Sequence, residues 1–198
     1  MIAEWVRTGT IQIGTPIPPL SLLILSIPNK VFAYDIIKGA VIVNVLLGLG
    51  IIYLIMVIVY IITSSKSIML FLGLIVATHP SLVHYSCNLL RENSYLFFLC
   101  LSIMYTIRFV KTSFYYNILY AVVFASLSIF SRHEGFEVLV ILLFICALSG
   151  SKSNRLFRIT GCILMAFFST ISIALFLLLF GVPFNYYIEY WKLFYNYF

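Results

Sequence analysis

The sequence predicts an all-α protein, a multi-pass transmembrane helical bundle of about six spans preceded by an N-terminal interfacial helix. Of the 198 residues, 63% are hydrophobic and only 9% are charged, and the mean hydropathy is +1.12, well above the range of soluble domains. The charged residues stand singly between long apolar runs. The length leaves room for one bundle, so we expect a single transmembrane domain over residues 1–198.

The first element is expected at the membrane surface rather than across the membrane. The tripeptide Pro-Pro-Leu at residues 18–20 favours a helix start, because proline is tolerated in the first turn of a helix. The helical core, residues 20–27, is too short to cross about 30 Å of hydrocarbon. Residues 1–14 lack the charge and apolar pattern of a cleavable signal peptide. We therefore place both ends of this segment on the same side of the bilayer.

The spans that follow are bounded by charged residues, because a charge at the bilayer centre is costly. The second one is interrupted by His79 and Pro80, so its helix is expected to end near Thr78 and to be followed by a loop or interfacial turn. The fifth carries Glu137 in its first turn, and that carboxylate has to face water or a partner. In order, the six predicted spans are residues 39–63, 66–78, 94–110, 115–130, 136–150 and 159–181.

The loops on the two faces of this topology differ in charge. One face carries only basic residues, which is typical of cytoplasmic loops: Lys66, Arg108, Lys111, Lys152, Arg155 and Arg158. The other face carries six basic residues and all six acids: Arg7, Lys30, Lys38, Arg91, Arg132 and Lys192 with Glu4, Asp35, Glu92, Glu134, Glu137 and Glu189. This second face is interpreted as the outer face of the membrane.

The net charge of +6 does not indicate a nucleic-acid partner, because the basic residues are scattered along the membrane flanks instead of concentrated on one solvated face. The four cysteines are Cys87, Cys100, Cys146 and Cys162. They lie in or beside apolar segments without C-x-x-C spacing, so neither a disulfide framework nor a zinc ribbon is expected.

Ionisable residues cluster at two places on the predicted outer face. One cluster runs from His84 through Arg91 and Glu92, where a carboxylate is able to act as a base or to accept a hydrogen bond from a sugar hydroxyl. The alternative is an Arg-Glu pair that caps and anchors the next helix. The other cluster is Arg132-His133-Glu134, near Glu137. Its guanidinium suits a phosphate, whereas the alternative is interfacial snorkelling around the turn at Gly135.

A metal site formed by these histidines and acids is a weaker hypothesis. The candidate ligands are His79, His84, His133, Glu92 and Glu134, whose imidazole and carboxylate groups suit a metal ion. Their spacing matches no metal motif, so we predict neither a metal nor a cofactor.

The order of these segments resembles the GT-C glycosyltransferases. The resemblance rests on Pro-Pro-Leu at residues 18–20, Leu-Leu-Arg-Glu-Asn-Ser-Tyr-Leu-Phe-Phe at 89–98 and Ser-Ile-Phe-Ser-Arg-His-Glu-Gly at 128–135. It is greatest for the group that includes the protein O-mannosyltransferases, the lipid A aminoarabinose transferase and the Rgt-type bacterial enzymes. It covers nearly the whole chain, which corresponds to the N-terminal part of that family's length.

The resemblance implies an active site on the periplasmic or lumenal side and a sugar donor carried on a polyprenyl phosphate. The acceptor is a lipid, a glycan or a protein, and the membrane is the cytoplasmic membrane if the source is bacterial. The catalytic assignment falls on Glu92, which matches the family's acidic residue at the start of a span. Substrate binding falls on Arg91, Arg132, His133, Glu134 and His84, and among them Arg132 matches a basic turn residue of the family.

Two features of this sequence depart from the family pattern. The family's first span and the catalytic acid after it correspond to sequence upstream of residues 1–5, so the chain is expected to be a shortened and inactive form if that acid is required. Ile17 also stands where many members have a polar or basic residue. The alternative function is a multi-pass transporter or a non-catalytic membrane subunit whose outer-face charges line a substrate path.

Overall fold

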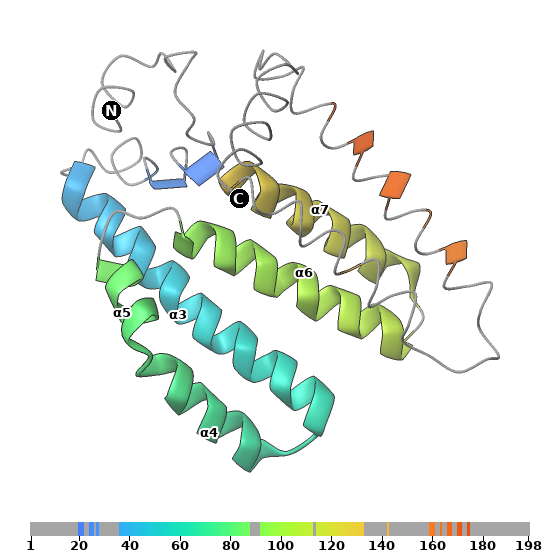
Figure 1. The fold of residues 1–198 in the computed structure, drawn as a ribbon, viewed down its shortest axis with the longest axis horizontal. Coiled ribbons are helices and arrows are strands. Elements are labelled where there is room, and N and C mark those ends of the chain that lie inside the picture. The colour runs from blue at the N-terminus through green and yellow to red at the C-terminus, as the bar shows by residue number, and fades with distance from the viewer. Residues whose placement is uncertain are drawn as a thin grey trace, which may run out of the picture.

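A computed structural model describes residues 36–87, 92–112 and 114–132 continuously. It also describes single positions elsewhere, at residues 20, 21, 24, 25, 27, 142, 159, 160, 163, 166, 167, 170, 171 and 174. Within these residues the chain is helical and contains no strand, which confirms the predicted all-α class (Figure 1). The continuous helices are α3 (Ile36–Thr63), α4 (Lys66–Ala77), α5 (Pro80–Cys87), α6 (Glu92–Thr112) and α7 (Tyr115–Ser131).

Three of these helices match predicted spans closely. The predicted ranges 39–63, 94–110 and 115–130 correspond to α3, α6 and α7, and each boundary lies within three residues of the observed one. By length and composition, two described helices are able to cross a membrane, over Ile37–Thr63 and Glu92–Thr112. The bent pair α4–α5 makes a third if it is counted as one span, and α7 is apolar but shorter.

The turn between α3 and α4 is built from two serines. Ser64 adopts a left-handed backbone conformation with φ 55°, and its N–H donates to the carbonyl of Tyr60 at 2.8 Å. Ser65 is the N-cap of α4, and its hydroxyl accepts from the N–H of Ile68. Because these serines satisfy backbone groups at both helix ends, the chain reverses within two residues.

The second predicted span requires a correction. Its helix ends where expected, at Thr78, whose hydroxyl donates back to the carbonyl of Leu74 at 2.9 Å. The following residues, predicted as a loop or interfacial turn, instead form α5, at 57° to α4. Pro80 breaks the first helix but is the first residue of the second, a position where its missing N–H and fixed φ are both tolerated.

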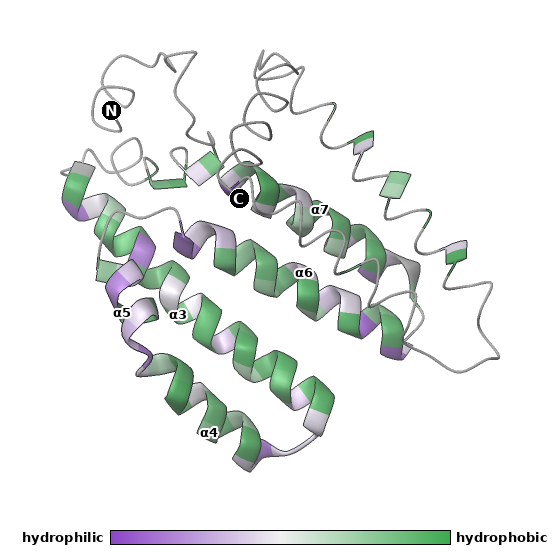
Figure 2. Cartoon of the chain, viewed as in Figure 1, coloured by the Kyte–Doolittle hydropathy of each residue, from purple (hydrophilic) through white to green (hydrophobic). Residues whose placement is uncertain are grey.

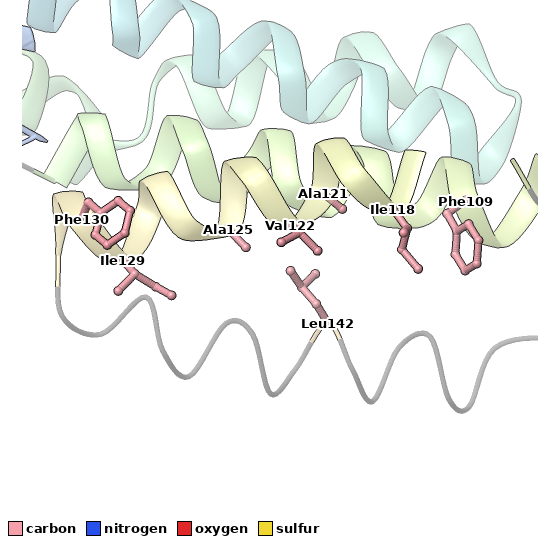
Figure 3. Close-up of a cluster of buried hydrophobic side chains, with 8 residues drawn as sticks. All are labelled: Phe109, Ile118, Ala121, Val122, Ala125, Ile129, Phe130 and Leu142. Carbon is pink, nitrogen blue, oxygen red and sulfur yellow. The ribbon is translucent and has the colours of Figure 1, made fainter. Parts of the chain in front are cut away.

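The helix α6 lies between α3 and α7, and α4 and α5 pack against α3 (Figure 1). Figure 3 shows the larger core cluster, in which α7 side chains meet Phe109 of α6 and the isolated described residue Leu142. Across the α6–α7 contact the ring of Tyr105 stacks on that of Phe124, with centroids 5.6 Å apart, and the hydroxyl of Ser102 donates to the carbonyl of Ala121 at 2.8 Å. A second cluster joins α3, α5 and α6 through Ile51, Leu54, Leu82, Cys100 and Met104.

The predicted segment over residues 20–27 is helical at each position that the structure describes. Leu25 is buried, and the hydroxyl of Ser21 donates to the carbonyl of Ser131 at 3.1 Å. This short segment is therefore anchored at the end of α7. The predicted spans 136–150 and 159–181 lie mostly outside the described residues. Leu142 and eight positions from 159 to 174 within them are helical.

The charged residues of the continuous helices gather near helix ends, and the middle of α3 and α4 is apolar (Figure 2). At one end of the bundle Lys111 donates through Nζ to the carbonyl of Ile61 in the last turn of α3. A lysine there complements the negative end of the helix dipole. Lys66, at the start of α4, lies at the same end and is exposed. The acid Glu92 and the base Arg132 lie at the opposite end, where α6 starts and α7 stops.

Candidate functional site

The candidate site lies where the antiparallel helices α6 and α7 begin and end. Glu92 is the first residue of α6, and Arg132 directly follows the last residue of α7 as its C-cap. The backbone N–H of Arg132 still donates to the carbonyl of Ser128 at 2.9 Å, while its own backbone is extended. An acid at a helix N-terminus and a base at a helix C-terminus are each favoured by the helix dipole.

The side chains of Glu92 and Arg132 form an ion pair. Nη1 of Arg132 donates to Oε1 of Glu92 at 3.3 Å. The Glu92 side chain is 19% exposed and the Arg132 side chain is 31% exposed, so the pair is only partly accessible to water. The second carboxylate oxygen, Oε2 of Glu92, is buried and has no hydrogen-bond partner within the described residues. The pair thus holds one oxygen of the carboxylate and leaves the other for a further donor.

The remaining predicted site residues have different outcomes. His84 lies in the last turn of α5, where it is exposed and its ring meets that of Tyr85 edge to face, with centroids 6.2 Å apart. Arg91, His133 and Glu134 lie outside the described residues. The structure therefore brings together Glu92 and Arg132, which came from two separate sequence clusters. Within its described part, the chain has no group of three or more His, Cys, Asp or Glu side chains that is able to hold a metal ion.

A polar junction beside Glu92 was missed by the sequence reasoning. Asn93 is fully buried, and its Nδ2 donates to the carbonyl of Asn44 at 3.1 Å and to the hydroxyl oxygen of Ser86 at 3.2 Å. These contacts join α6 to α3 and α5. The signal that was available is the presence of an uncharged amide, Asn44, inside an apolar span, since buried amides need hydrogen-bond partners.

Comparison of the chain with protein-family models, with curated proteins and with solved structures finds no match.

Proposed function

We propose that this protein is a membrane glycosyltransferase, or a shortened piece of one, that transfers a sugar from a polyprenyl-phosphate donor to an acceptor on the outer face of the membrane. The observation that supports the proposal is the Glu92–Arg132 ion pair. A sugar transfer of this kind needs a carboxylate close to a cation, and the pair supplies both at one end of an apolar bundle. The proposal includes six spans and, in a bacterium, location in the inner membrane.

In the proposed reaction, Glu92 takes the proton of the acceptor hydroxyl as that oxygen bonds to the anomeric carbon of the sugar. The bond between this carbon and the phosphate oxygen breaks, and its electron pair goes to the polyprenyl phosphate. The guanidinium of Arg132 stabilises the charge that develops on the departing phosphate, because its planar fork of N–H donors matches two phosphate oxygens. Attack from the side opposite the phosphate inverts the anomeric carbon.

The ion pair itself then represents the state without donor. A phosphate that enters the site competes with Glu92 for the guanidinium of Arg132. Once Arg132 turns to the phosphate, the Glu92 carboxylate is released from the ion pair and is able to accept a hydrogen bond from the acceptor hydroxyl. Donor binding would in this way prepare the base for the acceptor.

The test is sugar transfer from a polyprenyl-phosphate donor by the intact protein in proteoliposomes. Arg132→Ala and Glu92→Gln are each expected to slow transfer by at least about a hundredfold. Arg108→Ala is the matched control, because Arg108 is an exposed arginine on α6 whose guanidinium lies over the ring of Tyr105, 5.6 Å from its centroid, near the opposite end of the helix. Transfer that persists in both site variants, or that falls equally in the control, would refute the assignment.

The second candidate, a transporter, is favoured by a different observation. The α4–α5 pair is bent by 57° at Thr78 and His79, and interrupted helices of this kind surround the substrate sites of many transporters. A transporter moves its substrate into sealed vesicles without making a new glycosidic bond. Accumulation of an unmodified solute, with no transferred sugar, would therefore favour this candidate over the enzyme.

A further inference from the structure

The polar junction next to the ion pair is an ordered set of hydrogen bonds between three helices. The hydroxyl of Ser86 donates to the carbonyl of Leu82 at 2.9 Å, so its oxygen is left to accept from Nδ2 of Asn93. The second hydrogen of the same amide reaches the carbonyl of Asn44 in α3. Nδ2 of Asn44 in turn donates to the carbonyl of Tyr85 in α5, at 3.5 Å. Each of the three helices is thereby linked to the other two.

The close approach of α5 to α3 depends on Gly48. A Cβ at this position would lie 2.3 Å from Oγ of Ser86 and 3.3 Å from its Cβ, and the first distance is far inside van der Waals contact. The absence of a side chain therefore lets Ser86 sit against α3, within reach of Asn93. The junction is thus specified by a glycine as well as by its polar groups.

We propose that Asn93 is a positioning residue that holds the Glu92 side chain beside Arg132. The effect of Asn93 on catalysis rests on the proposed function. Neighbouring residues of a helix point about 100° apart, because a turn contains 3.6 residues. Asn93 faces α3 and α5, and Glu92 faces α7. With both amide hydrogens attached to different helices, the first turn of α6 is fixed in rotation and height, and the carboxylate is held beside the guanidinium.

The first test measures the ion pair and requires no sugar donor. Melting temperatures are recorded for Glu92→Gln, Arg132→Gln and the double variant, and the departure from additivity reports the coupling of the two side chains. The same cycle is repeated with Asn93→Ala. We expect the departure from additivity to disappear in that background. A departure of unchanged size would overturn the proposal.

The control for this cycle is Ser94→Ala. Ser94 is the next residue along α6, is equally buried, and its hydroxyl has no hydrogen-bond partner within the described part of the chain. Its removal is expected to leave the coupling intact. If Asn93→Ala does not fold, Ser86→Ala is the milder variant, because it removes only one of the two amide contacts, and it is expected to reduce the coupling. An unreduced coupling in Ser86→Ala would count against the proposal.

The second test uses sugar transfer. A residue that acts through Glu92 should slow transfer in the native protein by on the order of tenfold to a hundredfold, and should slow it no further once Glu92 is already glutamine. A general loss of structure would lower both rates. The coupling between Glu92 and Arg132 could disappear in the Asn93→Ala background while the native protein uses no polyprenyl-phosphate donor. In that case the proposed function fails, and the positioning of the ion pair by Asn93 stands.

Discussion

Replacement of Glu92 by glutamine should change donor binding and sugar transfer in opposite directions. Glutamine keeps the shape of the side chain and removes its charge. The Glu92 carboxylate then no longer competes with the donor phosphate for Arg132, so the KM for the donor should fall. The acceptor hydroxyl has no base, so kcat should fall as well, for an unrelated reason.

The size of the first effect follows from the geometry of the pair. Two unit charges 3.3 Å apart attract by about 1 kcal/mol in water, and by more at a partly buried site. Desolvation and ordering of the side chains offset part of that gain, and net values for partly exposed pairs reach about 1 kcal/mol. This corresponds to a donor KM lowered about fivefold. Loss of a general base lowers kcat by about a hundredfold to ten-thousandfold.

The assay is the initial rate of transfer from a labelled polyprenyl-phosphate sugar in proteoliposomes, with donor concentration varied at saturating acceptor. Arg108→Gln serves as the control for loss of one charge at the other end of α6. A Glu92→Gln variant with unchanged kcat would show that the carboxylate is not the base. A donor KM that rises instead of falling would show that the carboxylate does not compete with the phosphate for Arg132.

Three further predictions concern packing and topology. Gly48→Ala should lower the melting temperature because of its clash with Oγ of Ser86, and Ser86→Ala in the same chain should restore part of the loss; no restoration would contradict the clash. Gly73→Ala should be tolerated within about 1 kcal/mol, since its new Cβ meets only atoms of the flexible Met56 side chain, Sδ at 2.7 Å and Cγ at 2.8 Å, and alanine favours the helix; a large drop in melting temperature would contradict this. In a chain whose other cysteines are replaced, a membrane-impermeant maleimide should label the exposed Cys87 from the outer face. A cysteine introduced by Lys66→Cys should be labelled only after the membrane is permeabilised. Labelling of both positions from one side would contradict the topology.

The helices were predictable to the extent that charge marks their ends. The boundaries of α3, α6 and α7 follow the charged residues that interrupt the apolar runs. The helix α5 was not predicted, because its eight residues are only weakly apolar and Pro80 was interpreted as a break alone. A proline is able to end one helix and to begin another, and Pro80 does both here, with Leu82 of the new helix packed in the cluster that α3 and α6 share.

The sequence predicted the two charged residues of the site, but it did not predict that they form an ion pair. Glu92 and Arg132 were chosen for their chemistry in separate clusters, and a sequence separation of 40 residues says nothing of their pairing. The pairing depends on how α6 and α7 align, and contacts between them such as the hydrogen bond from the Ser102 hydroxyl to the carbonyl of Ala121 cannot be predicted from the sequence. Asn93 could not be predicted from the pattern of charges, because its contribution comes from two amide hydrogens in an apolar interior.

The unequal lengths of α3 and α7 connect the ion pair to the thickness of the surrounding lipid. At 28 residues α3 is about 42 Å long, and at 17 residues α7 is about 25 Å long, against about 30 Å of hydrocarbon. If both helices cross the membrane, a bilayer that matches α3 is thicker than α7 is long, and the difference falls on residues at the ends of α7, where Arg132 lies. We expect longer acyl chains to withdraw the Glu92–Arg132 pair from water and shorter ones to expose it. Hydrophobic mismatch would then be a means by which lipid composition sets how readily the pair opens.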